Sequence, residues 1–262
     1  MDKLNCVYKQ YQNQNNLKTR SNIHKMYSTN KQGFMNWIFE RYKLENNANV
    51  LELGCGDGDI WKHHINNYDL KYELTLSDIS PGMLKNCQEN LFKINNVKYR
   101  VIDIQDIPYE DNTFDIIIAN MMLYHVPNLN LGLKEVSRVL KPNGTFYCAT
   151  FGEKTIGSYI NNLSSMQILN ESTYKFTLQN GSIILSNFFD SIEKDVYLDA
   201  LHITKPSDLI DYLNSFSEFS NLSHDELSKV TKILNDEFNR NNGLINIPKE
   251  YGMFIAKGKY GG

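Results

Sequence analysis

Short apolar runs alternate with amphipathic stretches over the central part of the chain, between residues 49 and 150. Five of these runs have the length and the β-branched or aromatic content of strands. They are residues 49–53, 73–77, 97–102, 115–119 and 145–150. Strands that alternate with helices form a parallel sheet with helices on both faces. The pattern therefore predicts an α/β fold with a doubly wound, mostly parallel sheet.

Two stretches between these runs have the apolar spacing of helices that pack one face on a sheet. Their apolar positions are Met83, Cys87 and Leu91 in the first stretch and Leu129, Leu133, Val136 and Leu140 in the second. Ser80 before Pro81 is typical of an N-cap followed by proline in the first helical position. Residues 141–144, Lys-Pro-Asn-Gly, are expected to stop the second helix before the fifth strand.

The flanks of this region are less regular. Residues 20–44 place apolar residues among polar ones, consistent with one or two helices that lead into the sheet and cover its ligand edge. Beyond residue 150 the pattern predicts a helix near 156–163, a turn at Asn180-Gly181, a strand over 191–198 and a helix that begins with a capping box at 223–226.

Composition excludes several classes of protein. With 22% charged and 41% hydrophobic residues, the 262-residue chain is expected to be globular, and a net charge of -3 provides no basic surface for nucleic acid. Its four cysteines lie far apart without metal-ligand spacing, which indicates reduced thiols and no metal. No apolar run has the length of a signal core or a membrane span. We expect a cytoplasmic monomer or homodimer without membrane insertion.

A glycine-rich loop follows the first predicted strand, in the sequence Leu51-Glu-Leu-Gly-Cys-Gly-Asp-Gly58. Glycines let a backbone turn tightly and approach a ligand, and ligands of open α/β sheets bind beyond the carboxyl ends of the strands. The loop lacks the G-x-G-x-x-G spacing of dinucleotide sites, because Asp59 stands at the third glycine position, and no P-loop lysine follows. A nucleotide-like ligand fits this position, although such loops also occur for structural reasons.

Polar residues also follow the next three strands. Asp78 can accept both hydroxyl hydrogens of a ribose, or serve as a charge at a helix N-terminus. Asp103, beside Ile104, can accept from an adenine amine, or belong to a solvated turn. Asn120 can meet an ammonium group with its amide oxygen, or cap a loop. Their joint position at consecutive strand ends favours a common ligand site.

These motifs resemble those of class I S-adenosylmethionine-dependent methyltransferases, especially the branch related to ubiquinone/menaquinone biosynthesis. The matching stretches are residues 51–58, 76–83, 103–108, 114–120 and 135–144. The resemblance implies a Rossmann-like, seven-stranded sheet that binds S-adenosylmethionine. It assigns Gly54 and Gly56 to the methionine part, Asp78 and Ile79 to the ribose, Met83 and Ile104 to the surroundings of adenine, and Asp103 to the adenine amine. Glu52, Asp57, Asn120 and, from the leading segment, Tyr27 complete the predicted cofactor site.

We therefore expect one compact domain of three consecutive parts. An N-terminal helical lid segment occupies residues 1–48, and the S-adenosylmethionine-binding α/β core occupies residues 49–150. Residues 151–262 supply cap helices and complete the sheet. No internal repeat or low-complexity linker separates these parts.

Methyl transfer from a sulfonium is an in-line displacement, so a methyltransferase mainly aligns donor and acceptor and excludes water. His125 is the candidate general base, because imidazole titrates near neutrality, but it can equally fix the loop or shape the pocket. Tyr124 can contact the acceptor or pack under the cap. No metal is needed for this reaction.

The acceptor is expected to be a small molecule. Met121, Met122 and Leu123 follow Asn120 where many nucleobase and protein-amide methyltransferases have Pro-Pro-Tyr. Aromatic residues after residue 150 can form an apolar acceptor pocket or plain core; they are Phe151, Tyr159, Phe176, Phe188 and Phe189. Two other functions stay open: a non-catalytic module that binds S-adenosylmethionine or S-adenosylhomocysteine, and a nicotinamide-dependent oxidoreductase, which the glycine spacing disfavours.

Overall fold

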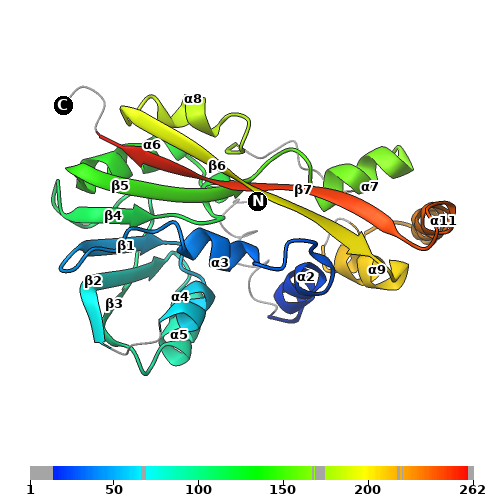
Figure 1. Cartoon of the computed structure of the whole chain (residues 1–262), viewed down its shortest axis with the longest axis horizontal. Coiled ribbons are helices and arrows are strands. Elements are labelled where there is room, and N and C mark those ends of the chain that lie inside the picture. The colour runs from blue at the N-terminus through cyan, green and yellow to red at the C-terminus, as the bar shows by residue number, and fades with distance from the viewer. Residues whose placement is uncertain are drawn as a thin grey trace. The chain divides into compact units, whose positions relative to one another are not determined.

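The computed structural model describes residues 14–65, 69–166, 168, 175–216, 219 and 221–258, and Figure 1 shows its elements. The strands are β1 (Asn49–Leu53), β2 (Asp69–Asp78), β3 (Asn95–Val101), β4 (Phe114–Ile118), β5 (Leu140–Phe151), β6 (Ser191–Ile203) and β7 (Ile245–Lys257). The helices are α2 (Gln14–Tyr27), α3 (Phe34–Phe39), α4 (Asp59–His64), α5 (Pro81–Asn90), the 3₁₀ turn η1 (Leu123–His125), α6 (Leu129–Val139), α7 (Ile156–Ser164), α8 (Gly181–Leu185), α9 (Pro206–Asn214) and α11 (His224–Arg240).

The strands form one seven-stranded sheet in the order β3-β2-β1-β4-β5-β7-β6. The pairs β1·β2, β1·β4, β2·β3 and β4·β5 are parallel, with Leu51 beside both Thr75 and Ile117. The chain moves outward from β1 to β3 and then returns to the other side of β1 with β4. Open α/β sheets bind ligands beyond the carboxyl ends of the strands at such a reversal, which here lies between β1 and β4. The predicted doubly wound, mostly parallel, seven-stranded sheet is confirmed.

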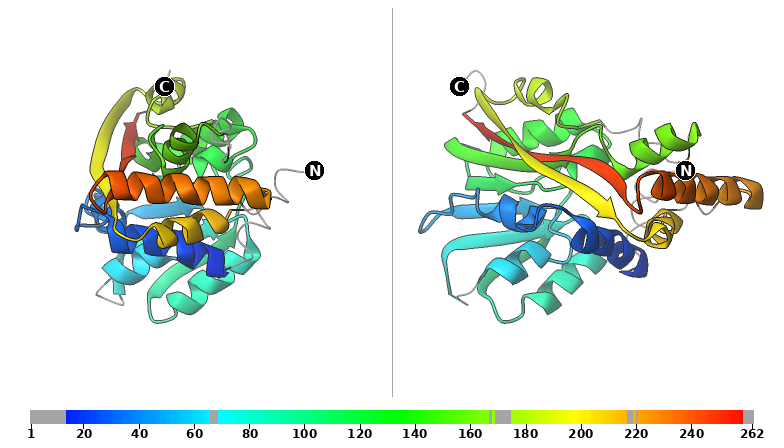
Figure 2. Two further views of the ribbon diagram at one scale, coloured as in Figure 1. Left: turned by 90° about the vertical axis from the view of Figure 1, so that its right-hand side faces the viewer. Right: turned by 45° about the vertical axis from the view of Figure 1, so that its right-hand side comes forward.

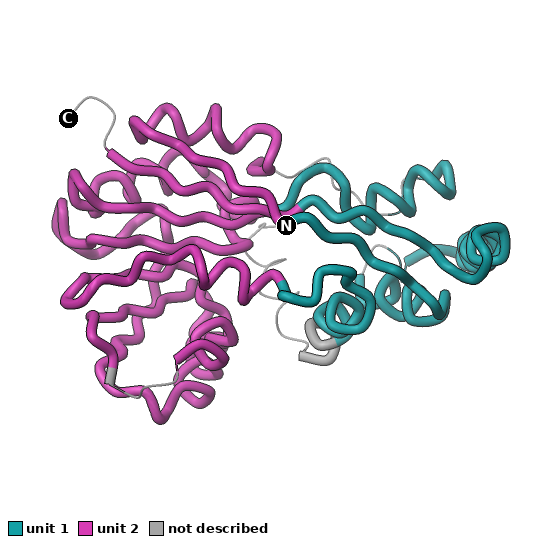
Figure 3. The backbone as a smooth tube through the Cα atoms, in the orientation of Figure 1, with its two compact units in different colours: residues 1–33, 151–174, 198–250 teal, residues 34–150, 175–197, 251–262 magenta. Residues whose placement is uncertain are grey.

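The chain divides into two compact units, coloured separately in Figure 3. Unit 1 consists of residues 1–33, 151–174 and 198–250, and unit 2 of residues 34–150, 175–197 and 251–262. This division differs from the predicted one, in which three consecutive parts form one compact domain. The difference arises because β6 and β7 each contribute residues to both units, so neither unit is a continuous stretch of chain.

In unit 2, alternate residues of the strands enter two separate hydrophobic clusters. Leu51 and Leu53 of β1 pack with α6, whereas Val50 packs with α3, α4 and α5. Both views of Figure 2 show α4 and α5, in cyan and teal, on the same side of the sheet. Each large apolar side chain fully buried in this way contributes about 1.5–3 kcal/mol. The expected helices on both faces are therefore present.

Of the predicted boundaries near the site, the start of α5 is confirmed, whereas β5 begins five residues earlier than predicted. Helix α5 begins after Ser80, whose Oγ accepts from the Met83 N–H at 3.4 Å, and Pro81 is its first residue. Helix α6 ends at Val139, and β5 begins at once with Leu140, so that residues 141–144 already belong to the strand. Glycine is required at position 144, because a Cβ there would lie 2.7 Å from Leu140 Cδ1 and 3.0 Å from a backbone oxygen.

The predicted turn at Asn180-Gly181 is only partly correct. Asn180 ends a turn, but Gly181 is the first residue of the short helix α8. A Cβ at Gly181 would lie 2.4 Å from the Phe254 ring, so this glycine allows close packing. The helix near 156–163 and the capping box of Ser223 and Glu226 at the start of α11 are present as predicted.

Unit 1 has a hydrophobic core of its own, formed by α2, α7, α9, α11 and parts of β6 and β7. Its buried residues include Ile23, Leu201, Leu209, Leu234 and Ile247. The sequence pattern did not predict α9 or β7. None of the described helices is both long and apolar enough to cross a membrane.

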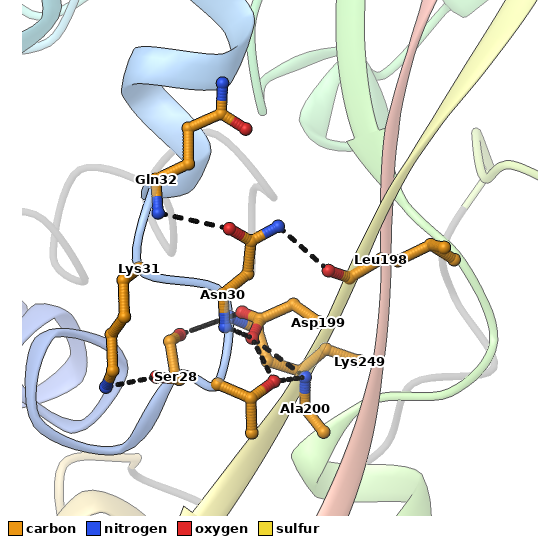
Figure 4. Close-up of polar contacts among 9 residues, drawn as sticks. Ser28, Asn30, Lys31, Gln32, Leu198, Asp199, Ala200 and Lys249 are labelled. Atoms are coloured by element: carbon orange, nitrogen blue, oxygen red, sulfur yellow. Dashed lines mark hydrogen bonds and ion pairs between the residues drawn. The ribbon is translucent and has the colours of Figure 1, made fainter.

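A buried ion pair lies beside this core, between Asp199 of β6 and Lys249 of β7 (Figure 4). Their side chains are 0% and 3% exposed, and Lys249 Nζ lies 2.6 Å from Asp199 Oδ2. Asp199 also accepts from Ser28 Oγ at 2.8 Å, from the Asn30 N–H at 3.0 Å and from its neighbour's N–H. Residues 28–30 thus bind along β6, where Ser28 pairs with Leu201 in an antiparallel bridge.

Candidate functional site

The glycine-rich loop after β1 has three glycines with left-handed backbone conformations, at φ values of 72°, 57° and 76° for Gly54, Gly56 and Gly58. A Cβ at Gly54 would lie 3.0 Å from Met122 Cγ, and a Cβ at Gly58 would lie 2.7 Å from Cys87 Sγ. A Cβ at Gly56 would meet nothing within 4 Å. Gly54 and Gly58 therefore allow close packing within unit 2, whereas Gly56 borders open space where a ligand fits.

Asp78, at the end of β2, holds this loop in place. Its Oδ2 accepts from the Gly56 N–H at 3.0 Å, and its Oδ1 accepts from the Ser80 N–H at 2.8 Å. Burial raises the pKa of Asp78, and these two hydrogen bonds oppose the rise. Asp78 is thus a charged residue near the N-terminus of α5, which was the alternative role considered for it. Each carboxylate oxygen can still accept a further hydrogen bond, as binding of two ribose hydroxyls requires.

Glu52 of β1 is an almost fully buried carboxyl group, 2% exposed. Its Oε2 accepts from the indole N–H of Trp61, and its Oε1 lies 3.4 Å from the Asn120 amide nitrogen. Burial raises the pKa of Glu52 to about 7, and the charge of Asp78 adds to the rise. Trp61, on α4, was not among the predicted site residues.

Asn120, directly after β4, has one half of its amide bonded and the other half unsatisfied. Its Nδ2 donates to the hydroxyl of Tyr42 at 2.6 Å. Its Oδ1 is buried and has no hydrogen-bond partner among the described residues. Buried acceptors are nearly always paired in folded proteins, so this oxygen is available to accept a hydrogen bond from a ligand. Tyr42 was also missed by the sequence interpretation.

The loop after β3 orients Asp103 through Gln105. The backbone N–H of Gln105 donates to Asp103 Oδ1 at 2.9 Å, and its side-chain amide contacts both carboxylate oxygens at 3.1 Å. The Gln105 Oε1 in turn accepts from the Asn128 N–H at 3.0 Å. Asp103 is half-buried. Its contacts with Gln105 fit both the predicted role at the adenine amine and the alternative role of a turn residue.

Ile104, which directly follows Asp103, is buried. Its side chain is 4% exposed and lies in the core of unit 2, where a Cβ at Gly132 would touch it at 3.4 Å. Its predicted contact with adenine stays a prediction. Ile79 and Met83, by contrast, are half-buried at the start of α5.

Asp57 occupies the last part of the glycine-rich loop and is half-buried. Its Oδ1 accepts from the Asp59 N–H at 3.3 Å, at the start of α4. Its backbone oxygen accepts from the Asn90 side chain at 2.9 Å. Both contacts shape the loop, and the predicted contact of Asp57 with the cofactor stays a prediction.

The two candidate catalytic residues lie together in η1. The rings of Tyr124 and His125 are 4.4 Å apart between centroids, and both residues are half-buried. Burial lowers the pKa of His125 to about 4, so its imidazole is neutral at pH 7 and is a weaker base than a free histidine. Met121 enters this segment with a φ of 52°, a left-handed conformation that costs a non-glycine residue about 1–2 kcal/mol. Such strain is typical of ligand-binding segments.

The remaining predicted residues have structural contacts. Tyr27 belongs to unit 1, where its hydroxyl donates to Asp208 Oδ2 at 2.5 Å, so its contact with the cofactor stays a prediction. Of the aromatic residues considered for an acceptor pocket, Phe151, Phe176 and Phe189 are buried. Phe176 and Phe189 are plain core of unit 2, while Tyr159 and Phe188 are half-buried. Among the described residues, no group of three or more His, Cys, Asp or Glu could hold a metal ion.

Comparison with known proteins agrees with this geometry. Residues 51–148 match the family described as methyltransferase domain. The ubiquinone/menaquinone biosynthesis C-methyltransferase UbiE of Rickettsia akari (strain Hartford) is 32% identical over 157 residues, which cover 48% of this chain and 63% of that protein. The protein of the same name from Rickettsia massiliae (strain Mtu5) is 27% identical over 209 residues, covering 62% and 83%. The chain thus spans less than two thirds of the first of these relatives.

Solved structures share the fold at low sequence identity. The YcgJ protein from Bacillus subtilis has a TM-score of 0.58 and 16% identity over 85% of this chain and 97% of that chain. Phosphoethanolamine N-methyltransferase 2 of Haemonchus contortus, solved with S-adenosyl-L-methionine, has a TM-score of 0.53 and 17% identity over 86% and 52%. In its sheet order, its glycine-rich loop and the match over residues 51–148, this chain is similar to the class I S-adenosylmethionine-dependent methyltransferases.

Proposed function

We propose that the protein transfers the methyl group of S-adenosylmethionine to a small-molecule acceptor. The observation that carries this proposal is the set of unsatisfied or open positions at adjacent strand ends. Gly56 borders open space, Asp78 has free acceptor capacity, and Asn120 Oδ1 is a buried acceptor without a partner among the described residues. These positions suit a ligand with ribose hydroxyls and an ammonium group.

In this proposal the parts of the cofactor follow the sheet order. Asp78 binds the ribose hydroxyls, and Asp103, on the β3 side, accepts from the adenine amine. Glu52 and Asn120, on β1 and after β4, face the amino acid part. Gly56 allows the backbone to approach the sulfur region without a side chain between them. Met83 and Ile79 pack beside the nucleoside.

When bound, S-adenosylmethionine supplies an electrophilic methyl group on a positively charged sulfur. The protein's residues have to orient the acceptor in line and exclude water from the crevice. Tyr124 and His125 follow Asn120 and line the acceptor side. His125 is neutral at pH 7, so its imidazole nitrogen can accept a proton from an acidic acceptor hydroxyl or carbon.

The names of the Rickettsia relatives support a narrower acceptor class. They are C-methyltransferases of ubiquinone and menaquinone biosynthesis. A carbon on an electron-rich aromatic ring is therefore the first acceptor class to test. Methylation of such a carbon replaces a ring hydrogen, so a base that removes this proton is part of the reaction.

Calorimetric titration with S-adenosylmethionine and S-adenosylhomocysteine tests the proposal first. We expect saturable binding, lowered about 30-fold or more in Asp78→Ala, because hydrogen bonds to charged groups contribute about 1.5–3 kcal/mol. Asp111→Ala, which removes an exposed carboxylate of unit 2, is the matched control and should bind as the wild type does.

Circular dichroism must show both variants folded. The absence of binding by folded, cofactor-free wild-type protein would refute the proposal, as would saturable competition by NADH at the same site. Binding without methyl transfer to any aromatic acceptor in a radiolabelled-methyl screen would refute the narrower acceptor class.

A further inference from the structure

The amide of Asn120 has a defined direction. Its Nδ2 faces two oxygens, the Tyr42 hydroxyl at 2.6 Å and Glu52 Oε1 at 3.4 Å. An ionised carboxylate can only accept hydrogen bonds, so the amide must present its NH₂ group to Glu52. The carbonyl oxygen then points away from both partners. This explains why Oδ1 is the atom left without a partner among the described residues.

Tyr42 is itself held rigidly. It lies just after α3, is buried, and its backbone N–H donates to the Phe39 oxygen at 3.1 Å. Its ring packs edge-on against Phe39 and Tyr147 at 5.6 and 5.2 Å and stacks against Trp61 at 6.4 Å. The hydroxyl of Tyr42 is therefore a fixed point to which the Asn120 amide is attached.

The strand order separates the two ends of a ligand. Asp78 ends β2, on one side of β1, whereas Asn120 follows β4, on the other side. If Asp78 binds the ribose of S-adenosylmethionine, the adenine base extends to one side of Asp78 and the amino acid part to the other. Asn120 Oδ1 then lies on the side of the amino acid part. The nearby Glu52 carboxylate favours a donor that is also a cation, and an ammonium group satisfies both requirements.

We propose that Tyr42 is a positioning residue, which together with Glu52 directs the Asn120 carbonyl oxygen at the ammonium group of the cofactor's amino acid part. The proposal rests on the proposed use of S-adenosylmethionine. Tyr42 lies outside residues 51–148, the segment that matches the methyltransferase domain family. The contact therefore adds a residue from the leading segment to the site formed by the matched domain.

The proposed orientation of the Asn120 amide depends on the ionisation of Glu52. A protonated carboxyl group can donate to the amide oxygen, which permits the reversed orientation of Asn120. Titratable groups that face Glu52 are Asp78 from β2, Tyr42 after α3, and Cys55 from its own loop. Because the pKa of Glu52 is about 7, recognition of the ammonium group is expected to weaken as the pH falls below 7.

A comparison of two ligands tests the role of Tyr42. S-Adenosylhomocysteine carries the amino acid part, and 5′-methylthioadenosine has the same adenosine and sulfur but lacks it. We expect Tyr42→Phe to lower the affinity for S-adenosylhomocysteine about tenfold, because it removes the hydrogen bond that fixes the amide. The affinity for 5′-methylthioadenosine should change less than about twofold.

Tyr147→Phe is the matched control. It removes a buried hydroxyl from the same aromatic cluster, one that accepts from the Lys43 N–H at 3.2 Å and does not contact Asn120. Both ligands should bind this variant as they bind the wild type. Equal losses for both ligands in Tyr42→Phe, or unchanged affinity for S-adenosylhomocysteine, would overturn the proposal while leaving cofactor binding intact.

A second measurement uses only the wild-type protein. The ratio of the affinity for S-adenosylhomocysteine to that for 5′-methylthioadenosine should rise between about pH 5.5 and 7.5 as Glu52 ionises. A constant ratio would overturn the proposal even if Tyr42→Phe failed to fold. Failure of the wild type to bind either ligand would instead refute the proposed function itself.

Discussion

Two buried carboxylates, one in each unit, have opposite environments. Asp199, in unit 1, receives hydrogen bonds from Lys249, Ser28 and backbone N–H groups. Burial by itself raises the pKa of Asp199, but these donors outweigh burial and bring the pKa to about 2. The donors to Glu52, in unit 2, are the neutral side chains of Trp61 and Asn120 in the described part of the chain, and burial prevails to bring its pKa to about 7.

The contrast distinguishes a structural polar cluster from a binding cluster. The Asp199–Lys249 pair has its charge compensated within unit 1, so ionisation stabilises the fold. Among the described residues, the Glu52–Asn120 cluster has no cation and leaves one acceptor without a partner. In the proposed site, a cationic ligand compensates the charge of Glu52. Two experiments test this contrast, and a third compares two glycines of the loop beside Glu52.

Removing the cation of the structural pair should have the largest effect. Lys249→Met leaves the Asp199 carboxylate buried without its counter-ion, which lowers the free energy of unfolding by about 3–5 kcal/mol. Urea denaturation at pH 7 measures the change. Lys154→Met is the control in the same unit, because Lys154 is 65% exposed in its pair with Glu250 and should matter by less than about 1 kcal/mol. Equal losses in the two variants would contradict the structural role of Asp199 and Lys249.

Neutralising the carboxyl group of Glu52 should raise the free energy of unfolding at high pH. The pKa of Glu52 is higher in the folded state than its ordinary value of 4.5, so its contribution to stability is present below pH 4.5 and is lost as the pH rises through about 7. Glu52→Gln removes this loss. The variant should be more stable than the wild type by about 3 kcal/mol at pH 8, relative to their difference at pH 4. Denaturation curves that change with pH in parallel for both proteins would show that Glu52 is not the group responsible.

The smallest changes in stability are expected from alanine substitutions at Gly58 and Gly56, two glycines of the loop after β1. Gly58→Ala should lower stability by about 2 kcal/mol, because its Cβ meets Cys87 Sγ in addition to the left-handed strain. Gly56→Ala has only the strain of about 1 kcal/mol but should lower the affinity for S-adenosylhomocysteine more than about tenfold, because its methyl enters the open space. Thermal melts and calorimetry measure both quantities. Unchanged affinity in Gly56→Ala would place the ligand away from this loop.

Much of the fold and the strand-end site follows from local sequence patterns. The run at residues 49–53 is β1 with the predicted bounds, and Asp78 and Asn120 stand at the predicted strand ends. Period, turn residues and glycine spacing act over a few residues, and such signals can be seen in one chain. Ile104 is buried, and its predicted place beside adenine stays a prediction, because an apolar residue after a strand can face a ligand or the core.

The parts that sequence could not provide depend on interactions between distant residues. Tyr42 meets Asn120 across 78 positions, and Lys249 meets Asp199 across 50. A lysine in a strand is normally an exposed residue, and only its partner on β6 makes burial favourable. β7 was missed because polar residues interrupt its pattern, and the two-unit division was missed because β6 and β7 contribute to both units.

The segment at residues 28–30 has a consequence for self-association. β6 is the outermost strand of the sheet, and an unpaired edge is a template for the addition of strands from other chains. The Thr29 N–H donates to the Ala200 oxygen, and the Asn30 side chain donates to the oxygen of Leu198, a residue 80% exposed. These hydrogen bonds occupy the backbone oxygens of Leu198 and Ala200 on the outer edge of β6. Detachment of this short segment would therefore turn a protected sheet edge into a nucleus for aggregation.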